Sequence, residues 1–192
     1  IFEKNMFDQV SSYVEKYLSP SLFGFRKGYS TQHGLSVMIN KWKKVMDSGK
    51  LAGALLTDLS KAFDCLNHEL LIAKLEAYGF DQPSLEYIYS YLSNRKQRTK
   101  VNNSYSSWTS TETGIPQGSI LGPLIFNIGL NDIFYFVNKE NLTNFADDNI
   151  PYEMGKCLEC VLKCLEDDAN ILLEWFNNNY LKMNADKCHL LV

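Results

Sequence analysis

Residues 51–58 read LAGALLTD, and this stretch decides how the rest of the sequence is interpreted. A short continuous run of small and apolar residues is typical of a strand buried inside a sheet. The residue that ends the run is an aspartate, Asp58. We therefore predict a central strand over 51–57, with the carboxylate of Asp58 at one end of the sheet.

Helical patterns lie on both sides of this strand. Apolar residues recur at helical spacing over 2–18, and a second helix is expected over about 31–49. After the strand, Asn67 is a suitable N-cap for a helix that Gly79 ends, and a further helix is expected over about 83–93. The first half of the chain is therefore mainly helical.

The second half of the chain alternates hairpins with helices. The expected elements are hairpins at 97–110 and 142–153, helices at 119–135 and 156–177, and a strand, turn and strand at 180–192. This order predicts an α+β fold in which an antiparallel sheet carries helices on one face.

The composition is that of a folded protein. The chain has 192 residues, the size of one domain or of two lobes that share a core. Hydrophobic residues make up 45% and charged residues 21%, which disfavours disorder and coiled coils. The net charge of −3 is uneven, since residues 1–50 carry eight Lys and Arg against four Asp and Glu, and residues 101–150 carry one against five. This suits an enzyme that binds a polyanion at one end and cations in its middle, although scattered solvated charge explains it equally well.

The cysteines and the apolar runs bear on where the protein works. Five cysteines without a secretory signal indicate an intracellular, reduced protein. Cys157, Cys160 and Cys164 have the spacing of a zinc motif, but they fall on a predicted helix, where buried small hydrophobic residues are expected instead. The longest apolar stretch, 120–130, is too short for a membrane span. The apolar run at the C-terminal end looks unfinished, so we expect the chain to be a piece of a longer protein.

Three aspartates carry the chemistry. Asp58 ends the predicted central strand, and Asp147 and Asp148 lie at the tip of the second hairpin. If the two strands are neighbours, the three carboxylates meet at one end of the sheet, where they repel each other unless cations lie between them. Oxygen ligands select Mg²⁺ or Mn²⁺, and two such ions serve in-line phosphoryl transfer. The alternative is that Asp147 and Asp148 are ordinary turn residues.

Six blocks of sequence, in this order and spacing, resemble the reverse transcriptases of non-LTR retrotransposons. The blocks are FGFRKGYST (23–31), DLSKAFD (58–64), YLSNRKQRTKV (91–101), GIPQGSILGPLIFNIGLNDI (114–133), FADD (145–148) and WFNNNYLKMNADKCHLLV (175–192). A tetrapeptide such as FADD alone is weak evidence, but six ordered blocks along nearly the whole chain are strong.

The resemblance implies the palm of a right-hand polymerase together with part of its fingers. Fingers-type elements would take about 1–50 and 80–112, the palm about 51–80 and 113–192, and a thumb would be absent. The implied function is an RNA-directed DNA polymerase core that serves retrotransposition, with an RNA template, a DNA primer and dNTP as partners. The implied cofactor is two Mg²⁺ ions, with Mn²⁺ as the alternative. No membrane partner is implied, and the implied location is the nucleus and the cytoplasm.

The resemblance also implies roles for residues of the catalytic centre. Asp58 and Asp147 match the carboxylates that bridge both metal ions, and Asp148 matches their neighbour. Phe63 matches the aromatic residue that crowds the sugar 2′ position, where a ring leaves no room for a hydroxyl; it is equally compatible with ordinary core packing. Lys187 matches a lysine that gives a proton to the departing pyrophosphate, with a solvated lysine as the alternative.

Further residues match positions that bind nucleotide or nucleic acid. Gln117 and Gly118 match the loop under the newly forming base pair, where glycine allows a close backbone approach. Arg26 and Lys27 lie in the fingers block, where cations meet triphosphate or template. Contacts to the template or primer backbone are expected from four cations of the first hairpin, with a solvated face as the alternative: Arg95, Lys96, Arg98 and Lys100.

Some positions depart from the family pattern. Phe145 stands where Tyr is more frequent, and Gly129 replaces a bulky aromatic residue inside a helix, so we expect a hole there. Tyr29 and Ile150 also depart, and none of these positions is a metal carboxylate. Two other functions stay open at this point: a decayed, non-catalytic RNA-binding remnant of such an element, and an intron-encoded reverse transcriptase.

Overall fold

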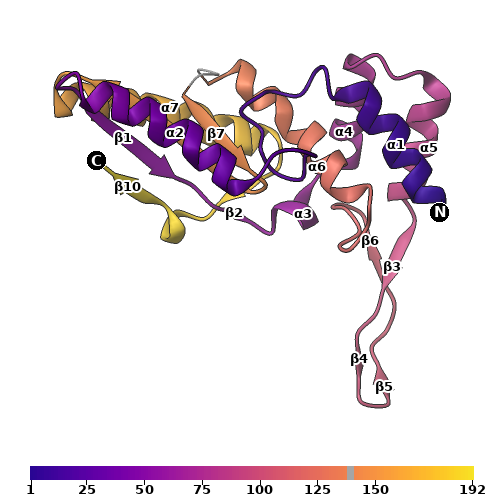
Figure 1. Ribbon diagram of the computed structural model, residues 1–192. Helices are drawn as coiled ribbons and strands as arrows, with labels where there is room; N and C mark the ends of the chain where they lie inside the picture. Colours follow the sequence, from indigo (N-terminus) through magenta and orange to yellow (C-terminus); the bar gives the residue numbers. More distant parts are fainter. Residues whose placement is uncertain (138–140) are drawn as a thin grey trace.

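The computed structural model describes residues 1–137 and 141–192, and its four-stranded antiparallel sheet has the strand order β10-β1-β8-β7 (Figure 1). The strands are β1 (Leu51–Leu56), β7 (Leu142–Phe145), β8 (Asp148–Gly155) and β10 (His189–Leu191), and the helices against them are α2 (Thr31–Met46) and α7 (Leu158–Asn178). The predicted strand over 51–57 is confirmed, and it lies inside the sheet between β8 and β10.

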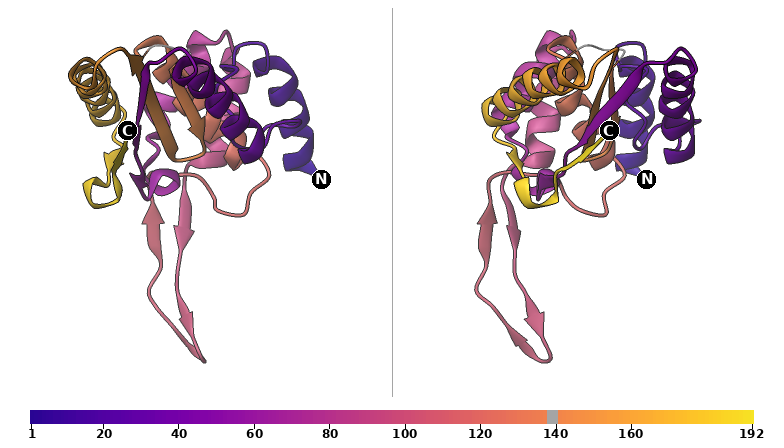
Figure 2. Two further views of the ribbon diagram at one scale, coloured as in Figure 1. Left: turned by 60° about the vertical axis from the view of Figure 1, so that its left-hand side comes forward. Right: turned by 90° about the vertical axis from the view of Figure 1, so that its left-hand side faces the viewer.

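Helices cover both faces of this sheet, which corrects the expectation of helices on one face. On one face, a Cβ added to Gly53 of β1 would lie 2.8 Å from Val161 of α7. On the other face, Met38 of α2 packs with Ala54, which is fully buried. Figure 2 shows the strands between the two helices. The cause lies in β1 itself, since its neighbouring residues point to opposite faces and both faces are apolar.

A group of helices beside the sheet forms the main hydrophobic core. Its members are α1 (Phe2–Val14), α4 (His68–Ala77), α5 (Gln82–Leu92), α6 (Gly122–Leu130) and the 3₁₀ helix η1 (Asn131–Tyr135). The Asn67 side chain accepts a hydrogen bond from the Leu70 amide, which confirms the predicted N-cap of α4. The single helix expected over 119–135 is split into α6 and η1.

The hole expected at Gly129 is reduced to a cavity of about 10 Å³, because a leucine fills most of the space. A Cβ added to Gly129 would lie 2.9 Å from Cδ1 of Leu66. The Gly129 carbonyl accepts a hydrogen bond of 2.6 Å from Lys74, whose ammonium also pairs with Asp132 at 2.7 Å. The helix therefore tolerates glycine here because its neighbours are packed directly against the backbone.

A long hairpin projects from the helical side of the molecule (Figure 1). Its base pairs β3 (Arg95–Gln97) with β6 (Thr109–Thr111), and its tip pairs β4 (Lys100–Val101) with β5 (Ser104–Tyr105). Between the pairs Gln97–Thr109 and Lys100–Tyr105, the outgoing strand has residues 98–99 and the returning strand has residues 106–108. The extra residue on the returning strand forms a bulge between the base and the tip of the hairpin. The hairpin predicted over 97–110 is confirmed and begins two residues earlier.

Short elements connect the end of β1 to the C-terminal part of the chain. They are β2 (Leu59–Ser60), α3 (Ala62–Cys65), β9 (Lys182–Met183) and the 3₁₀ helix η2 (Ala185–Lys187). Strands β2 and β9 pair with each other, and the Asn184 amide donates a hydrogen bond of 2.9 Å to the Asp58 carbonyl. These contacts bring η2 next to the end of the central strand.

The cysteines differ from the expectation of buried, unpaired side chains. Cys157 and Cys160 form a disulfide at the start of α7, and both are exposed, as is Cys164. Cys157 is the N-cap of α7 and Cys160 lies in its first turn, with 5.5 Å between their Cα atoms, which is a normal separation for a disulfide. In the part of the chain that is described, no helix is long and apolar enough to cross a membrane.

Candidate active site

The three predicted aspartates lie at the same end of the sheet. A two-residue turn that contains Asp147 joins β7 to β8, and Asp148 is the first residue of β8. Just beyond β1, Thr57 bridges to Asn149, and their backbones exchange hydrogen bonds of 3.0 and 3.2 Å. Because this pairing is antiparallel, its register places Asp58 opposite Asp148.

Two buried asparagines hold the turn that carries Asp147, and sequence analysis did not identify either of them. Asn144 donates to the Ala146 carbonyl at 2.8 Å and to the side-chain oxygen of Asn149 at 3.0 Å. Asn149 in turn donates to the Asp147 carbonyl at 3.1 Å. Ala146 has φ +57°, a left-handed conformation that costs free energy for a residue with a Cβ. The fully buried amides provide the hydrogen bonds that fix this turn.

The carboxylates and Lys187 influence one another electrostatically. Burial raises the pKa of Asp148, and the neighbouring carboxylates of Asp147 and Asp58 raise this pKa further. The ammonium of Lys187 lies 3.0 Å from Oδ2 of Asp58, and this hydrogen-bonded pair raises the pKa of Lys187. Asp147 and Asp148 also raise the pKa of Lys187, so the fields of all three carboxylates act at one place.

The carboxylates of Asp58, Asp147 and Asp148 supply the type of ligand that a divalent cation prefers. They offer oxygen ligands, which Mg²⁺ and Mn²⁺ prefer, and their fields favour a cation. Among residues 1–137 and 141–192, however, no three His, Cys, Asp or Glu side chains form a group that could hold a metal ion. The sharing of ions by these carboxylates therefore stays a prediction, and in this structure Lys187 supplies the positive charge beside Asp58.

An aromatic cluster lies next to the aspartates. The Phe63 ring, on α3, stacks on Phe126 of α6 with a centroid distance of 4.1 Å and an interplanar angle of 16°. Phe25 approaches Phe63 edge-on at 5.9 Å and also lies 6.5 Å from Phe145, which precedes the turn of the aspartates. Phe63 is half-buried, so one face of its ring belongs to the core while the side chain remains partly accessible.

The segment that contains Phe25 is packed directly on the turn between β7 and β8. A Cβ added to Gly24 would lie 2.5 Å from the Ala146 nitrogen, so only glycine fits there without movement. The Gly24 carbonyl accepts a hydrogen bond of 2.7 Å from Asn127 of α6. This segment therefore ties the basic N-terminal block to the end of the sheet that carries the aspartates.

Arg26 and Lys27 have different surroundings, although they are neighbours in the sequence. The Arg26 guanidinium is buried and donates to the Ser19 and Leu22 carbonyls and to the Glu15 carboxylate, at 2.6, 3.0 and 2.6 Å. These contacts hold its own loop together, so the structure does not support the predicted contact between Arg26 and the nucleotide. Lys27 is exposed, as a residue that contacts template or triphosphate must be.

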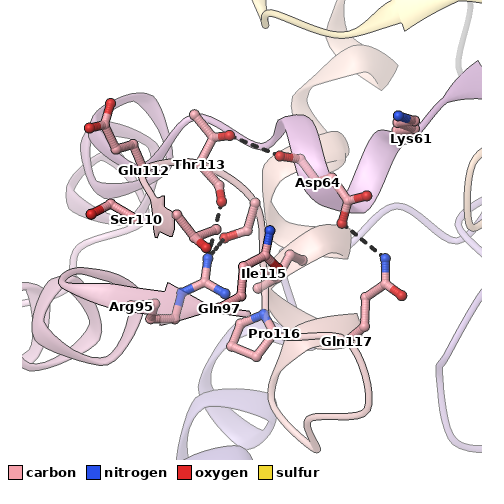
Figure 3. Close-up of a pocket in the computed structure, with 12 residues that line it drawn as sticks. Lys61, Asp64, Arg95, Gln97, Ser110, Glu112, Thr113, Ile115, Pro116 and Gln117 are labelled. Carbon is pink, nitrogen blue, oxygen red and sulfur yellow. Dashed lines mark hydrogen bonds between the residues drawn. The ribbon is translucent and has the colours of Figure 1, made fainter. Parts of the chain in front are cut away.

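The loop of Gln117 and Gly118 forms one wall of a pocket of about 640 Å³ between α3 and the base of the hairpin (Figure 3). Gln117 is exposed and donates a hydrogen bond of 2.9 Å to Oδ1 of Asp64. Gly118 has φ +85°, and a Cβ added there would meet no atom within 4 Å. The loop thus offers an open, left-handed backbone position to whatever occupies the site.

The four cations predicted on the hairpin also divide into two groups. Arg95 donates to the Leu92, Thr113 and Gly114 carbonyls at 2.8, 3.1 and 2.5 Å, so it fastens the hairpin base to the neighbouring loop (Figure 3). Arg95 therefore has a structural role, and its contact with nucleic acid stays a prediction. The other three cations, Lys96, Arg98 and Lys100, are exposed.

Two exposed aromatic side chains accompany these exposed cations. The Arg98 guanidinium lies 4.1 Å from the centre of the Tyr105 ring and 4.5 Å from that of Trp108. The Lys100 ammonium lies 5.3 Å from the centre of the Tyr105 ring. Cationic groups interleaved with aromatic rings are typical of surfaces that bind single-stranded nucleic acid.

A sheet of this topology, with aspartates at one end, a glycine-bearing loop beside them and a projecting basic hairpin, is that of the palm and fingers of a template-dependent polymerase. The chain belongs to the reverse transcriptase (RNA-dependent DNA polymerase) family, whose model matches residues 1–192.

Relatives among known proteins agree with this family. The chain is 30% identical over 172 residues to the probable RNA-directed DNA polymerase from transposon BS of Drosophila melanogaster. The aligned region covers 86% of this chain and 19% of the relative. It is 26% identical over 182 residues to the polymerase from mobile element jockey of the same species, covering 91% of this chain and 20% of the relative. The chain thus spans about a fifth of the length of these relatives.

Among solved structures, the fold resembles apo telomerase from Candida tropicalis truncated from its C-terminal domain. The TM-score is 0.68 at 15% identity, and the match covers 98% of this chain and 40% of the telomerase chain. At this identity the likeness concerns the fold.

Proposed function

We propose that the chain is the catalytic core of an RNA-directed DNA polymerase that serves retrotransposition. In the proposed reaction, a primer 3′-hydroxyl attacks the α-phosphate of a dNTP on an RNA template and pyrophosphate leaves. The observation that carries the proposal is the register that sets Asp58 opposite Asp148, with Asp147 in the adjoining turn. Three carboxylates at one end of a sheet repel each other, and a decayed element without catalysis has no function that would retain all three.

Asp58, Asp147 and Asp148 are the residues that would hold the divalent ions. When bound, such ions lower the pKa of the attacking hydroxyl and neutralise charge on the triphosphate. The turn that carries Asp147 is fixed by buried amides, so the carboxylates are held on a rigid frame. Lys187 is kept protonated beside this frame and gives the proton that the leaving pyrophosphate takes up.

Phe63 is the residue proposed to exclude ribonucleotides. Its ring is supported from behind by Phe126, so it cannot easily withdraw from a 2′-hydroxyl. A steric wall of this kind discriminates by clash and needs no hydrogen bond to the sugar. Gln117 and Gly118 are proposed to lie under the base pair that forms.

The template and primer are proposed to follow the hairpin. Lys96, Arg98 and Lys100 would contact phosphates, and Lys27 would contribute from the N-terminal block. In this proposal, about 1–50 and 80–112 act as fingers and about 51–80 and 113–192 as palm. A retrotransposon enzyme of this kind would work in the cytoplasm and the nucleus.

The test is primer extension by the natural full-length polypeptide, on an RNA template with dNTPs and Mg²⁺. The parent protein is expected to extend the primer, and Asp58→Asn is expected to abolish extension. Asp186→Asn is the matched control, since Asp186 is exposed and lies next to Lys187 in the sequence. If the parent protein binds RNA but does not extend primers, the chain is an RNA-binding remnant and the proposal is wrong.

A further inference from the structure

We propose that Asp64 is a positioning residue, which orients Gln117 in the nucleotide site and thereby sets nucleotide affinity without contacting the nucleotide. This inference rests on the proposed function, since that function assigns Gln117 to the nucleotide. Asp64 lies in α3 directly after Phe63, and its carboxylate and the Gln117 amide both line the pocket of Figure 3.

The first step of the argument is that α3 and the loop before α6 are joined along their backbones. The Ile115 amide donates to the Phe63 carbonyl at 2.8 Å, and the Gly114 amide donates to the Leu66 carbonyl at 2.8 Å. Helix α3 has only four residues, so its last carbonyls have no partner within the helix and depend on such donors. The loop is therefore the C-terminal support of α3.

The second step is that the two backbones touch at Asp64. Gly114 has φ +75°, and a Cβ there would lie 2.6 Å from the Cα of Asp64. The Thr113 hydroxyl adds a hydrogen bond of 2.9 Å to the Asp64 carbonyl. With main-chain contacts on this side already made, the carboxylate of Asp64 is not needed to hold the loop in place.

The third step concerns what that carboxylate does. Its Oδ1 accepts a hydrogen bond of 2.9 Å from Nε2 of Gln117. An ionised carboxylate only accepts hydrogen bonds, so the bond selects one of the two orientations of the Gln117 amide. Oε1 of Gln117 then points away from Asp64 and remains an acceptor for a donor group of the bound nucleotide.

The fourth step is energetic. Asp64 and Gln117 are both exposed, and within the described residues Asp64 forms no ion pair. A hydrogen bond between exposed, flexible side chains contributes little to folding stability. Its effect is to remove rotamers that Gln117 would otherwise populate, which lowers the entropy lost when a nucleotide binds.

The experiment is a double-mutant cycle in the natural full-length polypeptide, measured by single-turnover primer extension over a range of dNTP concentrations. Asp64→Ala is expected to raise the apparent Kd for dNTP about tenfold and to change the maximal rate by less than about twofold. In a Gln117→Ala background the same change is expected to have no further effect. Asp64→Asn offers Gln117 both an acceptor and a donor, so it no longer selects one orientation of the Gln117 amide, and it is expected to retain only part of the affinity.

The matched control is Glu112→Ala, because Glu112 is an exposed carboxylate that lines the same pocket. It removes the same charge and is expected to change the dNTP affinity less than about twofold. The melting temperature of Asp64→Ala is expected to stay within about 2 °C of the parent, because the lost bond is exposed.

Two outcomes would overturn the inference while the proposed function stands. Additive losses in the double variant would mean that Asp64 acts independently of Gln117. A large fall in the melting temperature together with an equal loss in Asp64→Asn would mean that the carboxylate serves the fold. If the parent protein does not extend primers at all, the proposed function is wrong, and this inference, which rests on it, is wrong as well.

Discussion

The ammonium of Lys187 lies 3.0 Å from Oδ2 of Asp58, so a residue of the last 3₁₀ helix forms an ion pair with the residue that ends the central strand. The pair forms because the Asn184 amide is hydrogen-bonded to the Asp58 carbonyl and anchors the turn. The Lys187 side chain is 65% exposed, so water screens this ion pair and it contributes little to folding stability. Lys187 is therefore free to leave Asp58 for an anionic substrate at little cost.

This freedom leads to a prediction for Lys187→Gln. If Lys187 gives a proton to pyrophosphate, the variant is expected to extend primers about 100-fold more slowly under single-turnover conditions. Lys182→Gln, an exposed lysine in β9, is the control and is expected to keep the parent rate. A rate for Lys187→Gln within about twofold of the parent would identify Lys187 as a solvated counter-ion of Asp58.

The variant Asp147→Asn separates catalysis from binding. It removes one formal charge from the acidic end of the sheet and keeps the shape of the side chain. The extension rate is expected to fall by about three decades or more, at 1.36 kcal/mol of transition-state stabilisation per decade. Template–primer affinity, measured by filter binding, is expected to change little because cations make the phosphate contacts. A near-normal rate would show that the metal assignment is wrong.

A third prediction concerns the sugar of the nucleotide. Phe63→Val shortens the side chain that stacks on Phe126 and is expected to raise incorporation of rNTP relative to dNTP at least tenfold. The measurement is the ratio of rate to apparent Kd for matched rNTP and dNTP pairs. Phe80→Val, another half-buried phenylalanine, is the control for a general loss of packing. Equal ratios in the parent and in Phe63→Val would mean that Phe63 is only a core residue.

The strands and hairpins were predictable because their patterns are local. The apolar run of 51–57 requires burial wherever it lies, and the two-residue turn at Asp147 follows from its neighbours in the sequence. Which faces of the sheet are covered is not a local property. It depends on how Gly53 and Ala54 meet helices that are distant in the sequence, and the prediction of helices on one face was wrong.

The partners of charged and polar side chains were less predictable than their positions. Arg26 and Arg95 look like ligands for phosphate in the sequence, yet both donate to backbone carbonyls at loops that the fold brings to them. Asn144 and Asn149 look like turn residues, yet they are buried and hold the turn that carries Asp147. A sequence shows that a donor is present, whereas only the fold shows which acceptor lies within reach.

The N-terminal helix supplies a prediction about pH. Glu3 accepts hydrogen bonds from the Tyr91 hydroxyl at 2.7 Å and from the Ile120 and Leu121 amides at 3.0 and 3.2 Å. The bond from Tyr91 is the main cause that holds the pKa of Glu3 below its usual value; burial opposes it, and the two amide bonds lower the pKa further. Mainly burial raises the pKa of Tyr91 to about 12, so Tyr91 does not titrate in the acid range.

Because the pKa of Glu3 is lower in the folded than in the unfolded protein, its contribution is present above the unfolded pKa of 4.5 and is lost as the pH falls through the folded pKa. Glu3→Gln is therefore expected to lower the free energy of unfolding by about 1 kcal/mol at pH 7. The difference from the parent is expected to shrink below about pH 4.5, as followed by urea unfolding at several pH values. A difference that stays constant down to pH 3 would show that the charge of Glu3 is unimportant.

The last prediction concerns the hairpin, where the structure separates free cations from a structural one. Replacing Lys96, Arg98 and Lys100 together by Ala is expected to weaken template–primer binding for all sequences. The slope of log affinity against log salt is expected to flatten by up to about 3, close to one for each lost phosphate contact. The measurement is filter binding over a salt series.

Two controls distinguish local phosphate contacts of the hairpin from an effect of net charge and from a loss of structure. A triple Ala variant of Lys43, Lys44 and Lys50 removes the same charge from exposed sites on and after α2 and is expected to keep the parent slope. Arg95→Ala is expected to lower the melting temperature, since three backbone carbonyls lose their donor, while changing the slope by much less than the triple hairpin variant. Equal slopes for the two triple variants would mean that long-range net charge governs binding and that the template runs elsewhere. A selective loss in the hairpin variant would locate the template along the three exposed cations and the rings of Tyr105 and Trp108 that lie beside them.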